Sequence, residues 1–354
     1  MMGMPNVLMI GPSPYAMGGM ASVEKNMLGA MRRRGEKVVF IPTTAEGGKA
    51  KKLAVAMFSY IKYRERLREC NLVHVHMASR GSYRRKKVFI ATAFSHNKPV
   101  LLHLHGSEFA TWYDEECSEE EKLEISRIFN RCAKVVVLSE EWKDFLLTRR
   151  ICDLERIEIL HNAVNIPSKN TTAYDRNTVL FMGRLDERKS PDVLLRSAVQ
   201  VLALHPDARF IFGGDGNALA YEQLACDLGI SNSCSFIGWA TSVKKDEAFR
   251  SSSIFCLPSK NEGMPMSVLE AMSYGLASVA TPVGGIPQVI TDGVDGLLFP
   301  VDDVDVLTEK LDSLMSDKAT KERIGRRGRT RIEEAFSLDA FMDRLGVIYE
   351  EICR

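Results

Sequence analysis

Short apolar runs of strand length alternate with longer amphipathic stretches along the whole chain of 354 residues. Strands that alternate with helices predict a parallel sheet covered by helices on both faces. The pattern starts again near residue 170, and a chain of this length exceeds one ordinary hydrophobic core. The sequence therefore predicts two doubly wound α/β domains. The expected strands are 7–10, 38–41, 72–76, 100–105 and 134–138 in the first domain, and 178–182, 209–212, 235–237, 254–257 and 278–281 in the second.

A polar stretch at residues 164–178 separates the two series of strands, so we expect domains at 1–168 and 169–336. A final helix is predicted over residues 337–354. Ser337 can cap its N-terminus, and Leu338, Phe341 and Leu345 recur at helical spacing.

The composition indicates a globular protein of the cytoplasm. No apolar run approaches the roughly 18 residues that a membrane-spanning helix needs. The eight cysteines form no C-x-x-C pair, which favours reduced thiols over disulfides or zinc ligands. The N-terminus has no cationic segment before its first apolar run, so a signal peptide is not expected.

The formal net charge of +1 hides an asymmetry between the two halves of the chain. Residues 1–107 contain 18 Lys and Arg against five Asp and Glu, concentrated at 32–34, 62–68 and 84–87. Charge runs often form a solvated face and nothing more. Three runs in one domain also suit an acidic partner, such as membrane lipid or a lipid-linked diphosphate, and nucleic acid is not expected.

The segment 261–270 carries two carboxylates, Glu262 and Glu270, around a glycine and a proline. Pro265 suits the first turn of a helix and Gly275 suits its end. Glu262 is therefore expected in a turn and Glu270 inside the helix. Since a helix N-terminus presents free backbone N–H groups, this segment could hold a polar ligand with one carboxylate on either side.

Other candidate residues lie where a strand ends. Gly18 and Gly19 lead into a helix, where backbone amides could approach a phosphate. Arg184 and Lys189 flank a turn and could stabilise charge that develops on a leaving diphosphate. His105 lies at the mouth of its strand. Turn glycines, a packed histidine and surface cations are the plain structural alternatives.

His74 and His76 have a spacing that would allow metal ligation. No acidic residue or cysteine lies nearby in the sequence to complete a ligand set, so no metal is expected there.

These motifs resemble those of glycosyltransferase family 4, also called group 1. The shared features are the two glutamates of segment 261–270, the Gly-Arg-x4-Lys run of 183–189, the glycine pair and the His-Gly of 105–106. The resemblance implies a GT-B fold, in which two Rossmann-like domains face a cleft and the last helix crosses back to the first domain. It also implies retaining, metal-independent transfer of a hexose or N-acetylhexosamine from a nucleotide sugar to a glycan, without a further cofactor.

The resemblance also implies individual roles. Glu270 would hold the ribose hydroxyls, Glu262 the sugar, and His105 the donor sugar or the leaving phosphate. Arg184, Lys189 and the amides of Gly18 and Gly19 would neutralise the diphosphate. Backbone contacts to the donor are expected from Gly214, Ile237, Gly263, Met264, Pro265 and Met266.

The chain departs from the family pattern at two positions. Ser190 stands where glycine is usual, and Gln288 stands where glutamate is expected, so no carboxylate role is assigned to position 288.

The basic run 84–87 precedes the apolar run 88–90, a pattern that suggests peripheral contact with the inner face of an anionic cytoplasmic membrane. The implied acceptor is a polyprenyl-diphosphate-linked glycan of polysaccharide biosynthesis. Two alternatives stay open: a sugar-nucleotide epimerase with the same double-sheet plan, and a catalytically silent protein that binds nucleotide sugars.

Overall fold

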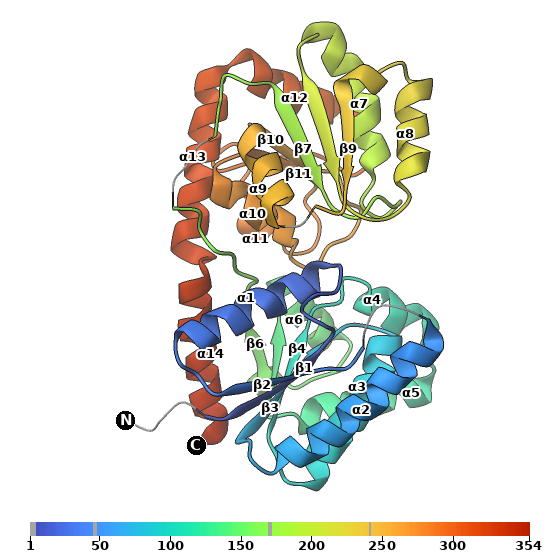
Figure 1. Cartoon of the computed structure of the whole chain (residues 1–354), viewed down its shortest axis with the longest axis vertical. Coiled ribbons are helices and arrows are strands. Elements are labelled where there is room, and N and C mark those ends of the chain that lie inside the picture. Colours follow the sequence, from blue (N-terminus) through green and yellow to red (C-terminus); the bar gives the residue numbers. More distant parts are fainter. Residues whose placement is uncertain (1–4, 45–47, 169–171, 241) are drawn as a thin grey trace. The chain divides into compact units, whose positions relative to one another are not determined.

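The computed structural model describes residues 5–44, 48–168, 172–240 and 242–354. The chain forms two compact units, one of residues 1–163 with 338–354 and one of residues 164–337. The division falls within five residues of the boundaries expected from the sequence. Each unit contains one six-stranded parallel sheet with flanking helices, so the prediction of two doubly wound α/β units is confirmed (Figure 1).

The sheet of the first unit has the strand order β2-β1-β3-β4-β5-β6. Its central strands are fully buried, as expected of a parallel sheet covered on both faces. The short edge strand β6 was not predicted from the sequence. The strands are β1 Val7–Gly11, β2 Val38–Pro42, β3 Leu72–Met77, β4 Val100–Leu104, β5 Lys134–Val137 and β6 Ile157–Ile159.

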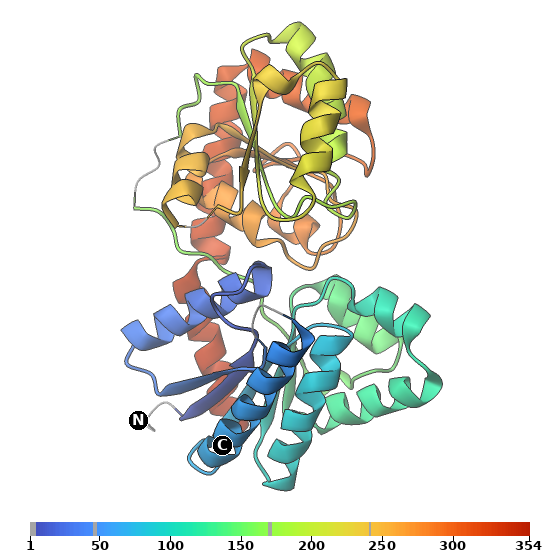
Figure 2. The ribbon, with the colours of Figure 1, turned by 45° about the vertical axis from the view of Figure 1, so that its right-hand side comes forward.

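Two helices, α1 and α14, cover one face of this sheet, and α2, α3, α5 and α6 cover the other (Figures 1 and 2). Successive residues of a strand point to opposite faces of the sheet, so each face has its own hydrophobic core. Met9 packs in the core beneath α1 and α14, and Leu8 packs in the core on the other face. The helices are α1 Gly19–Arg33, α2 Lys49–Leu67, α3 Gly81–Ser95, α4 Phe109–Thr111, α5 Glu119–Arg131, α6 Glu140–Thr148 and α14 Leu338–Cys353.

The last helix, α14, packs on the first unit although it follows the second unit in the sequence. Leu345 and Ile348 are fully buried in the core that α14 shares with α1. At the surface, Arg34, which directly follows α1, donates to Asp343 at 2.7 Å, and Arg344 donates to Glu158 of β6 at 2.7 Å. Apolar burial is the main contribution to this attachment, because exposed ion pairs stabilise little.

The second unit has the strand order β12-β11-β10-β7-β8-β9, and its short strand β12 was not predicted. The strands are β7 Thr178–Met182, β8 Arg209–Gly213, β9 Cys234–Gly238, β10 Ile254–Leu257, β11 Ala277–Ala280 and β12 Leu297–Leu298. The helices are α7 Pro191–Leu204, α8 Ala218–Asp227, α9 Ser242–Ser251, α10 Met266–Tyr274, α11 Ile286–Val289, α12 Val304–Ser316 and α13 Lys318–Ala335.

Strand order reverses beside the first strand of each sheet. In the first unit β1 lies between β2 and β3, and in the second β7 lies between β8 and β10. Ligands of open α/β sheets bind beyond the carboxyl ends of the strands at such a reversal. The loops that follow β1, β3, β7 and β10 are therefore the places to look for a site. None of the described helices is both long and apolar enough to cross a bilayer.

Candidate active site

Two loops of the second unit meet at its strand reversal. The loop after β7 carries Lys189, the loop after β10 carries Glu262, and the two side chains form an ion pair. Lys189 is 8% exposed and Glu262 is 6% exposed. A guanidinium nitrogen of Arg188 lies 3.7 Å from the same carboxylate oxygen, Oε1, and donates to the backbone oxygen of Asn261 at 2.9 Å. Arg188 was not among the site residues expected from the sequence.

The turn before α7 explains how Ser190 replaces a glycine. Ser190 has φ 48° and ψ 51°, which is the left-handed region that favours glycine. Its hydroxyl donates to the backbone oxygen of Glu187 at 3.0 Å, and Pro191 begins the helix with a suitable φ. The backbone N–H of Lys189 donates to the Asp186 carboxylate at 3.0 Å. These contacts hold the Lys189 side chain in place.

The second carboxylate, Glu270, lies within α10 as predicted. Pro265 occupies the position just before the helix rather than its first turn, and Gly275 ends it with φ 85°. Lys245 of α9 donates to Glu270 Oε1 at 2.6 Å. Lys245 was missed from the sequence, because nothing in the Lys-Lys pair of 244–245 indicates which lysine faces α10.

A glycine pair supports the turn that contains Glu262. Gly284 has φ 58°, and a Cβ atom there would lie 1.9 Å from the backbone oxygen of Glu262. The backbone N–H of Gly285 donates to the oxygen of Gly263 at 2.6 Å. Gln288 follows in α11, and Arg331 donates to its backbone oxygen at 3.1 Å. The sequence contained the glycine pair, but its contact with residue 262 is visible only in the structure.

Gly214 is required where the loops after β7, β8 and β9 interlock. Its φ is 152°, and a Cβ atom would lie 1.7 Å from the backbone oxygen of Gly183. Its N–H donates to the oxygen of Gly238 at 2.8 Å. Ile237 lies beside it in β9 and is half-buried. Arg184 is exposed in the same region, 3.6 Å from Asp186. Contact of these residues with a ligand stays a prediction.

In the first unit the glycine pair lies at the N-terminus of the 15-residue helix α1. Gly18 has φ 124°, and a Cβ atom on Gly18 or Gly19 would meet no described atom within 4 Å. The first turn of α1 contains no acidic residue. Open space, free backbone N–H groups and the positive end of the helix dipole suit an anion.

Four histidines form two stacked pairs, His74 and His76 in β3, and His103 in β4 with His105 directly after it. His76 Nδ1 lies 2.8 Å from His105 Nε2, and His74 Nε2 lies 3.3 Å from His103 Nδ1. His74 stacks on His76 with ring centroids 4.3 Å apart, and His103 stacks on His105 at 4.1 Å. Tyr349 of α14 completes the series, with its hydroxyl 2.7 Å from His74 Nδ1. His105 is therefore connected by contacts to the last helix.

Nitrogens of His74, His76 and His103 lie within 4.8 Å of one another. The facing nitrogens of His74 and His103 are 3.3 Å apart, and the Tyr349 hydroxyl lies 2.7 Å from the other nitrogen of His74. We interpret these contacts as a series of hydrogen bonds. Burial also lowers the pKa of all four imidazoles, that of His103 to about 3, so the rings are neutral.

The tautomers of the histidine rings can be assigned from two ring nitrogens that have no hydrogen-bond partner among the described residues. His76 Nε2 and His103 Nε2 are both buried and unpaired. A buried N–H without an acceptor is rarer than an unfilled acceptor, so we assign the proton to Nδ1 in both rings. His76 then donates to His105 Nε2, which leaves the proton of neutral His105 on Nδ1. His105 thus presents a hydrogen-bond donor.

Two further charged side chains of the first unit, Glu24 of α1 and Lys86 of α3, are buried, and neither carboxylate oxygen of Glu24 has a hydrogen-bond partner among the described residues. Both are essentially inaccessible to solvent. Gly11 makes room for the carboxylate, because a Cβ atom there would lie 1.9 Å from Glu24 Oε1. Burial raises the pKa of Glu24 to about 9, opposed by Lys86, and burial lowers the pKa of Lys86 to about 7, opposed by Glu24. Lys86 Nζ donates to Ser82 Oγ at 2.8 Å.

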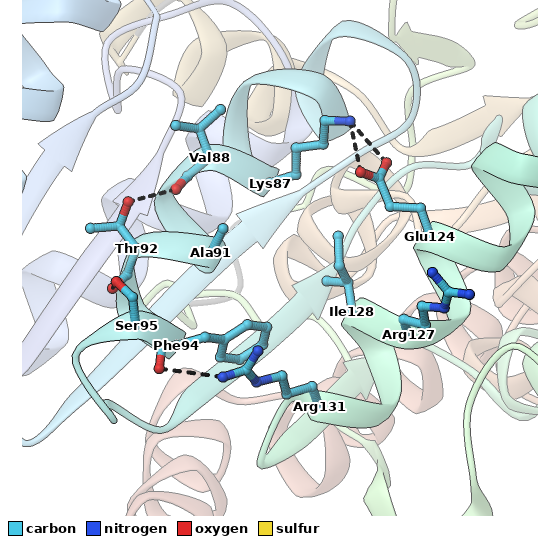
Figure 3. Close-up of a pocket in the computed structure, with 10 residues that line it drawn as sticks. All are labelled: Lys87, Val88, Ala91, Thr92, Phe94, Ser95, Glu124, Arg127, Ile128 and Arg131. Atoms are coloured by element: carbon cyan, nitrogen blue, oxygen red, sulfur yellow. Dashed lines mark hydrogen bonds and ion pairs between the residues drawn. The ribbon is translucent and has the colours of Figure 1, made fainter.

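The prediction that residues 84–90 form an exposed basic and apolar surface is wrong. Lys86, Phe89 and Ile90 are buried, because this side of α3 packs against the sheet and its neighbouring helices. Arg84 lies 3.5 Å from Glu121, and Lys87 lies 2.8 Å from Glu124 (Figure 3). The four cations therefore do not form one free cationic patch, and a run of charge in the sequence does not reveal which of its members is buried.

Two parallel, doubly wound units with polar loops at the carboxyl ends of their strands define the GT-B class of protein. The family described as Glycosyl transferases group 1 matches residues 164–331, and the one described as Glycosyltransferase Family 4 matches residues 17–167. The chain belongs to this glycosyltransferase family, and the resemblance inferred from its motifs is confirmed.

Curated relatives include two D-inositol 3-phosphate glycosyltransferases. The one from Kribbella flavida is 33% identical over 162 residues, which cover 43% of this chain and 38% of the relative. The one from Corynebacterium kroppenstedtii is 28% identical over 286 residues, or 73% of this chain and 62% of the relative. The matches thus span less than two thirds of each of these relatives.

Similar solved structures confirm the fold. Sucrose-phosphate synthase from Thermosynechococcus elongatus has a TM-score of 0.79 at 18% identity, with 98% of each chain covered. Anabaena Alr3699/HepE in complex with UDP and glucose has a TM-score of 0.77 at 16% identity, with 98% of this chain and 99% of that chain covered. At these identities the similarity concerns the fold alone.

Proposed function

We propose that this protein is a retaining glycosyltransferase that moves a hexose or N-acetylhexosamine from a nucleoside-diphosphate sugar to a glycan acceptor. The observation that carries the proposal is the buried Lys189–Glu262 pair at the strand reversal of the second unit. Family membership supports the reaction class. The similar structure of HepE, solved with UDP-glucose, supports a nucleotide sugar as donor.

Glu262 is suited to hold the donor sugar. Lys189 and Arg188 both contact its Oε1 atom, so Oε2 can accept hydrogen bonds from sugar hydroxyls. Glu270 is arranged in the same way, because Lys245 contacts only one of its oxygens, Oε1. We assign the ribose hydroxyls to the other oxygen of Glu270. In both cases the lysine fixes the orientation of the carboxylate.

The reaction breaks the bond between the anomeric carbon and the diphosphate and forms one to the acceptor oxygen. Negative charge develops on the leaving diphosphate. We assign Arg184, Lys189 and the amides at Gly18 and Gly19 to this charge, because fixed donors stabilise a charge that develops in the transition state more than they stabilise the ground state. The acceptor proton passes to the leaving phosphate oxygen, and no step requires a divalent metal.

His105 is assigned as a hydrogen-bond donor to the donor sugar or its phosphate. Its neutral ring carries a proton on Nδ1, because Nε2 accepts from His76. A ring in this state would stabilise developing negative charge without acting as a base. We assign His76 as the residue that positions His105.

We further propose that the acceptor is a polyprenyl-diphosphate-linked glycan in polysaccharide biosynthesis at the inner face of a membrane. The cationic first unit supports an acceptor of this charge.

A panel of UDP, GDP and ADP sugars in a thermal-shift assay tests donor binding, since a ligand of the native state raises the melting temperature. Transfer to a glycan acceptor, with the product's anomeric configuration determined by NMR, tests the reaction. An inverted product would overturn the retaining assignment. Conversion of the donor without any acceptor would identify an epimerase instead, and binding without turnover would identify a silent binding protein.

A further inference from the structure

Arg188 joins the two loops that carry Lys189 and Glu262. Its backbone oxygen accepts a hydrogen bond from the N–H of Lys260 at 2.8 Å, and its Nη1 atom donates to the backbone oxygen of Asn261 at 2.9 Å. The guanidinium is thereby held near the carboxylate of Glu262, with 3.7 Å between Nη1 and Oε1. At this distance the two charges attract each other without a hydrogen bond. Two cations, Lys189 and Arg188, therefore lie beside one buried carboxylate.

The two cations differ in how freely their charge can turn. The ammonium group of Lys189 ends a flexible chain of four carbons, and its contact with Glu262 uses one of its three N–H groups. Arg188 has a planar guanidinium that keeps its charge at every physiological pH, and its bond to Asn261 holds that plane in place. Lys189 can thus turn toward a second anion, whereas Arg188 stays beside Glu262.

Glu262 cannot follow Lys189, because its backbone is tightly packed. A Cβ atom at Gly284 would lie 1.9 Å from the backbone oxygen of Glu262, so the two segments are already in close contact. The N–H of Gly285 donates to the oxygen of Gly263 at 2.6 Å and holds the same turn. Since Glu262 is 6% exposed, water has little access to its carboxylate. Loss of a neighbouring cation therefore leaves a buried charge that is strongly destabilising.

The proposed reaction makes two demands on Lys189. It orients the carboxylate of Glu262 toward the sugar, and it stabilises the charge that develops on the leaving diphosphate. Phosphate oxygens form strong charge-assisted hydrogen bonds with lysine, so a bound diphosphate competes with Glu262 for the ammonium group. Glu262 then loses part of its compensation. Arg188 is positioned to supply it, because its charge already lies 3.7 Å from Oε1.

We propose that Arg188 is a positioning residue that compensates the charge of Glu262 when the diphosphate of the donor draws Lys189 away. This inference rests on the proposed function and deepens it, because it names the residue that allows one lysine to serve two anions. Arg188 then promotes binding of the diphosphate without touching it. A residue that contacted the phosphate, or that only held the two loops together, would act independently of the charge of Glu262.

A double-mutant cycle on nucleotide binding tests this dependence. The probes are UDP, GDP and ADP without a sugar, measured by isothermal titration calorimetry, and the cycle uses the diphosphate that the wild type binds. Arg188→Gln should raise the Kd roughly tenfold, the size of one contact between charged groups. Glu262→Gln removes the carboxylate that Arg188 compensates. In that background Arg188→Gln should change the Kd by less than about twofold.

Two further variants separate charge from structure. Arg188→Lys keeps the charge and loses the planar fork, so it should recover most of the affinity that Arg188→Gln loses. The matched control is Arg209→Gln at the start of β8, in the same unit. Arg209 also donates to a backbone oxygen, that of Ala208 at 2.8 Å, and its replacement removes the same charge. The control should bind nucleotide as the wild type does, and melting temperatures establish that each variant is folded.

Three results would overturn the inference and leave the donor site as proposed. One is an unchanged Kd in Arg188→Gln, and another is an equal loss of affinity in the wild-type and Glu262→Gln backgrounds. The third is Arg188→Lys that binds as weakly as Arg188→Gln. If the wild-type protein binds none of the three diphosphates, the proposed function itself fails, and this inference fails with it.

Discussion

Lys189 and Glu262 are 73 positions apart in the sequence, and their side chains form an ion pair that is almost completely buried. Such a pair contributes little net stability, because desolvation opposes the attraction, but removal of one partner leaves an uncompensated buried charge. Its position where the strand order reverses is the reason to connect it with ligand binding. The pair therefore links the stability of the second unit to the proposed reaction.

We expect Lys189→Ala and Arg184→Ala to affect catalysis alike and stability differently. Each should lower kcat/KM by about two to four orders of magnitude, as expected when one partner of the developing charge is removed. Only Lys189→Ala should lower Tm clearly, because Arg184 is exposed and its ion pair is weak. Steady-state kinetics and calorimetry measure both. Near-normal turnover in the two variants would remove the residues from the mechanism.

Substitution of Glu270 and of Glu262 should weaken the binding of different ligands. Glu270→Gln is expected to weaken both the free nucleoside diphosphate and the intact donor, because the ribose is common to them. Glu262→Gln should weaken the intact donor more than the diphosphate. Isothermal titration calorimetry with both ligands gives the comparison. Equal losses for both ligands in both variants would contradict the assigned roles.

His76 should act through His105 and not on the substrate itself. His76→Phe keeps a ring but removes the hydrogen bond, so we expect a roughly three- to tenfold loss of kcat/KM, the size of one hydrogen bond. His76→Gln supplies another N–H donor and should restore part of the activity. Nitrogen NMR should detect the His105 proton on Nδ1 in the wild type and a mixture of tautomers in His76→Phe. A wild-type proton on Nε2 would refute the assignment.

Glu24 predicts a dependence of stability on pH. Burial raises the pKa of Glu24 from its ordinary value of 4.5 to about 9, so folding takes up a proton between these pH values and the stability falls as pH rises. Between pH 5 and 7 this effect amounts to at most about 1.4 kcal/mol per pH unit. Lys86 acts in the opposite direction only above about pH 7, where its folded form loses its proton.

Chemical denaturation of the wild type and Glu24→Gln at pH 5, 6 and 7 measures this effect. The stability of the variant relative to the wild type should increase with pH. Glu65→Gln, at an exposed position of α2, is the control and should follow the wild type. The same pH slope in Glu24→Gln and the wild type would show that the carboxylate is not buried as described.

Removal of divalent metal should leave the reaction intact. The proposed charge stabilisation comes from Arg184, Lys189 and backbone amides, so turnover in excess EDTA is expected to stay within about twofold of the untreated enzyme. Loss of activity in EDTA that added Mg²⁺ or Mn²⁺ restores would require a metal in the mechanism.

The sequence by itself determined the succession of strands and helices, the division into two units and the family. These properties depend on local periodicity and on turn residues such as Gly275, which act over a few positions. The location of Glu262 in a turn and of Glu270 in a helix followed from the same local signals. The short strands β6 and β12 were not predicted, because two or three residues are too few to show a period.

The tertiary structure alone decided which residues are partners. Lys245 is 25 positions from Glu270, and the histidine pairs depend on the register that places His76 opposite His103. Lys86 was expected on the surface and is buried. Burial and pairing depend on how distant segments pack against one another. The free-energy cost of burying a charged side chain depends on the groups around it in space more than on its neighbours in the sequence.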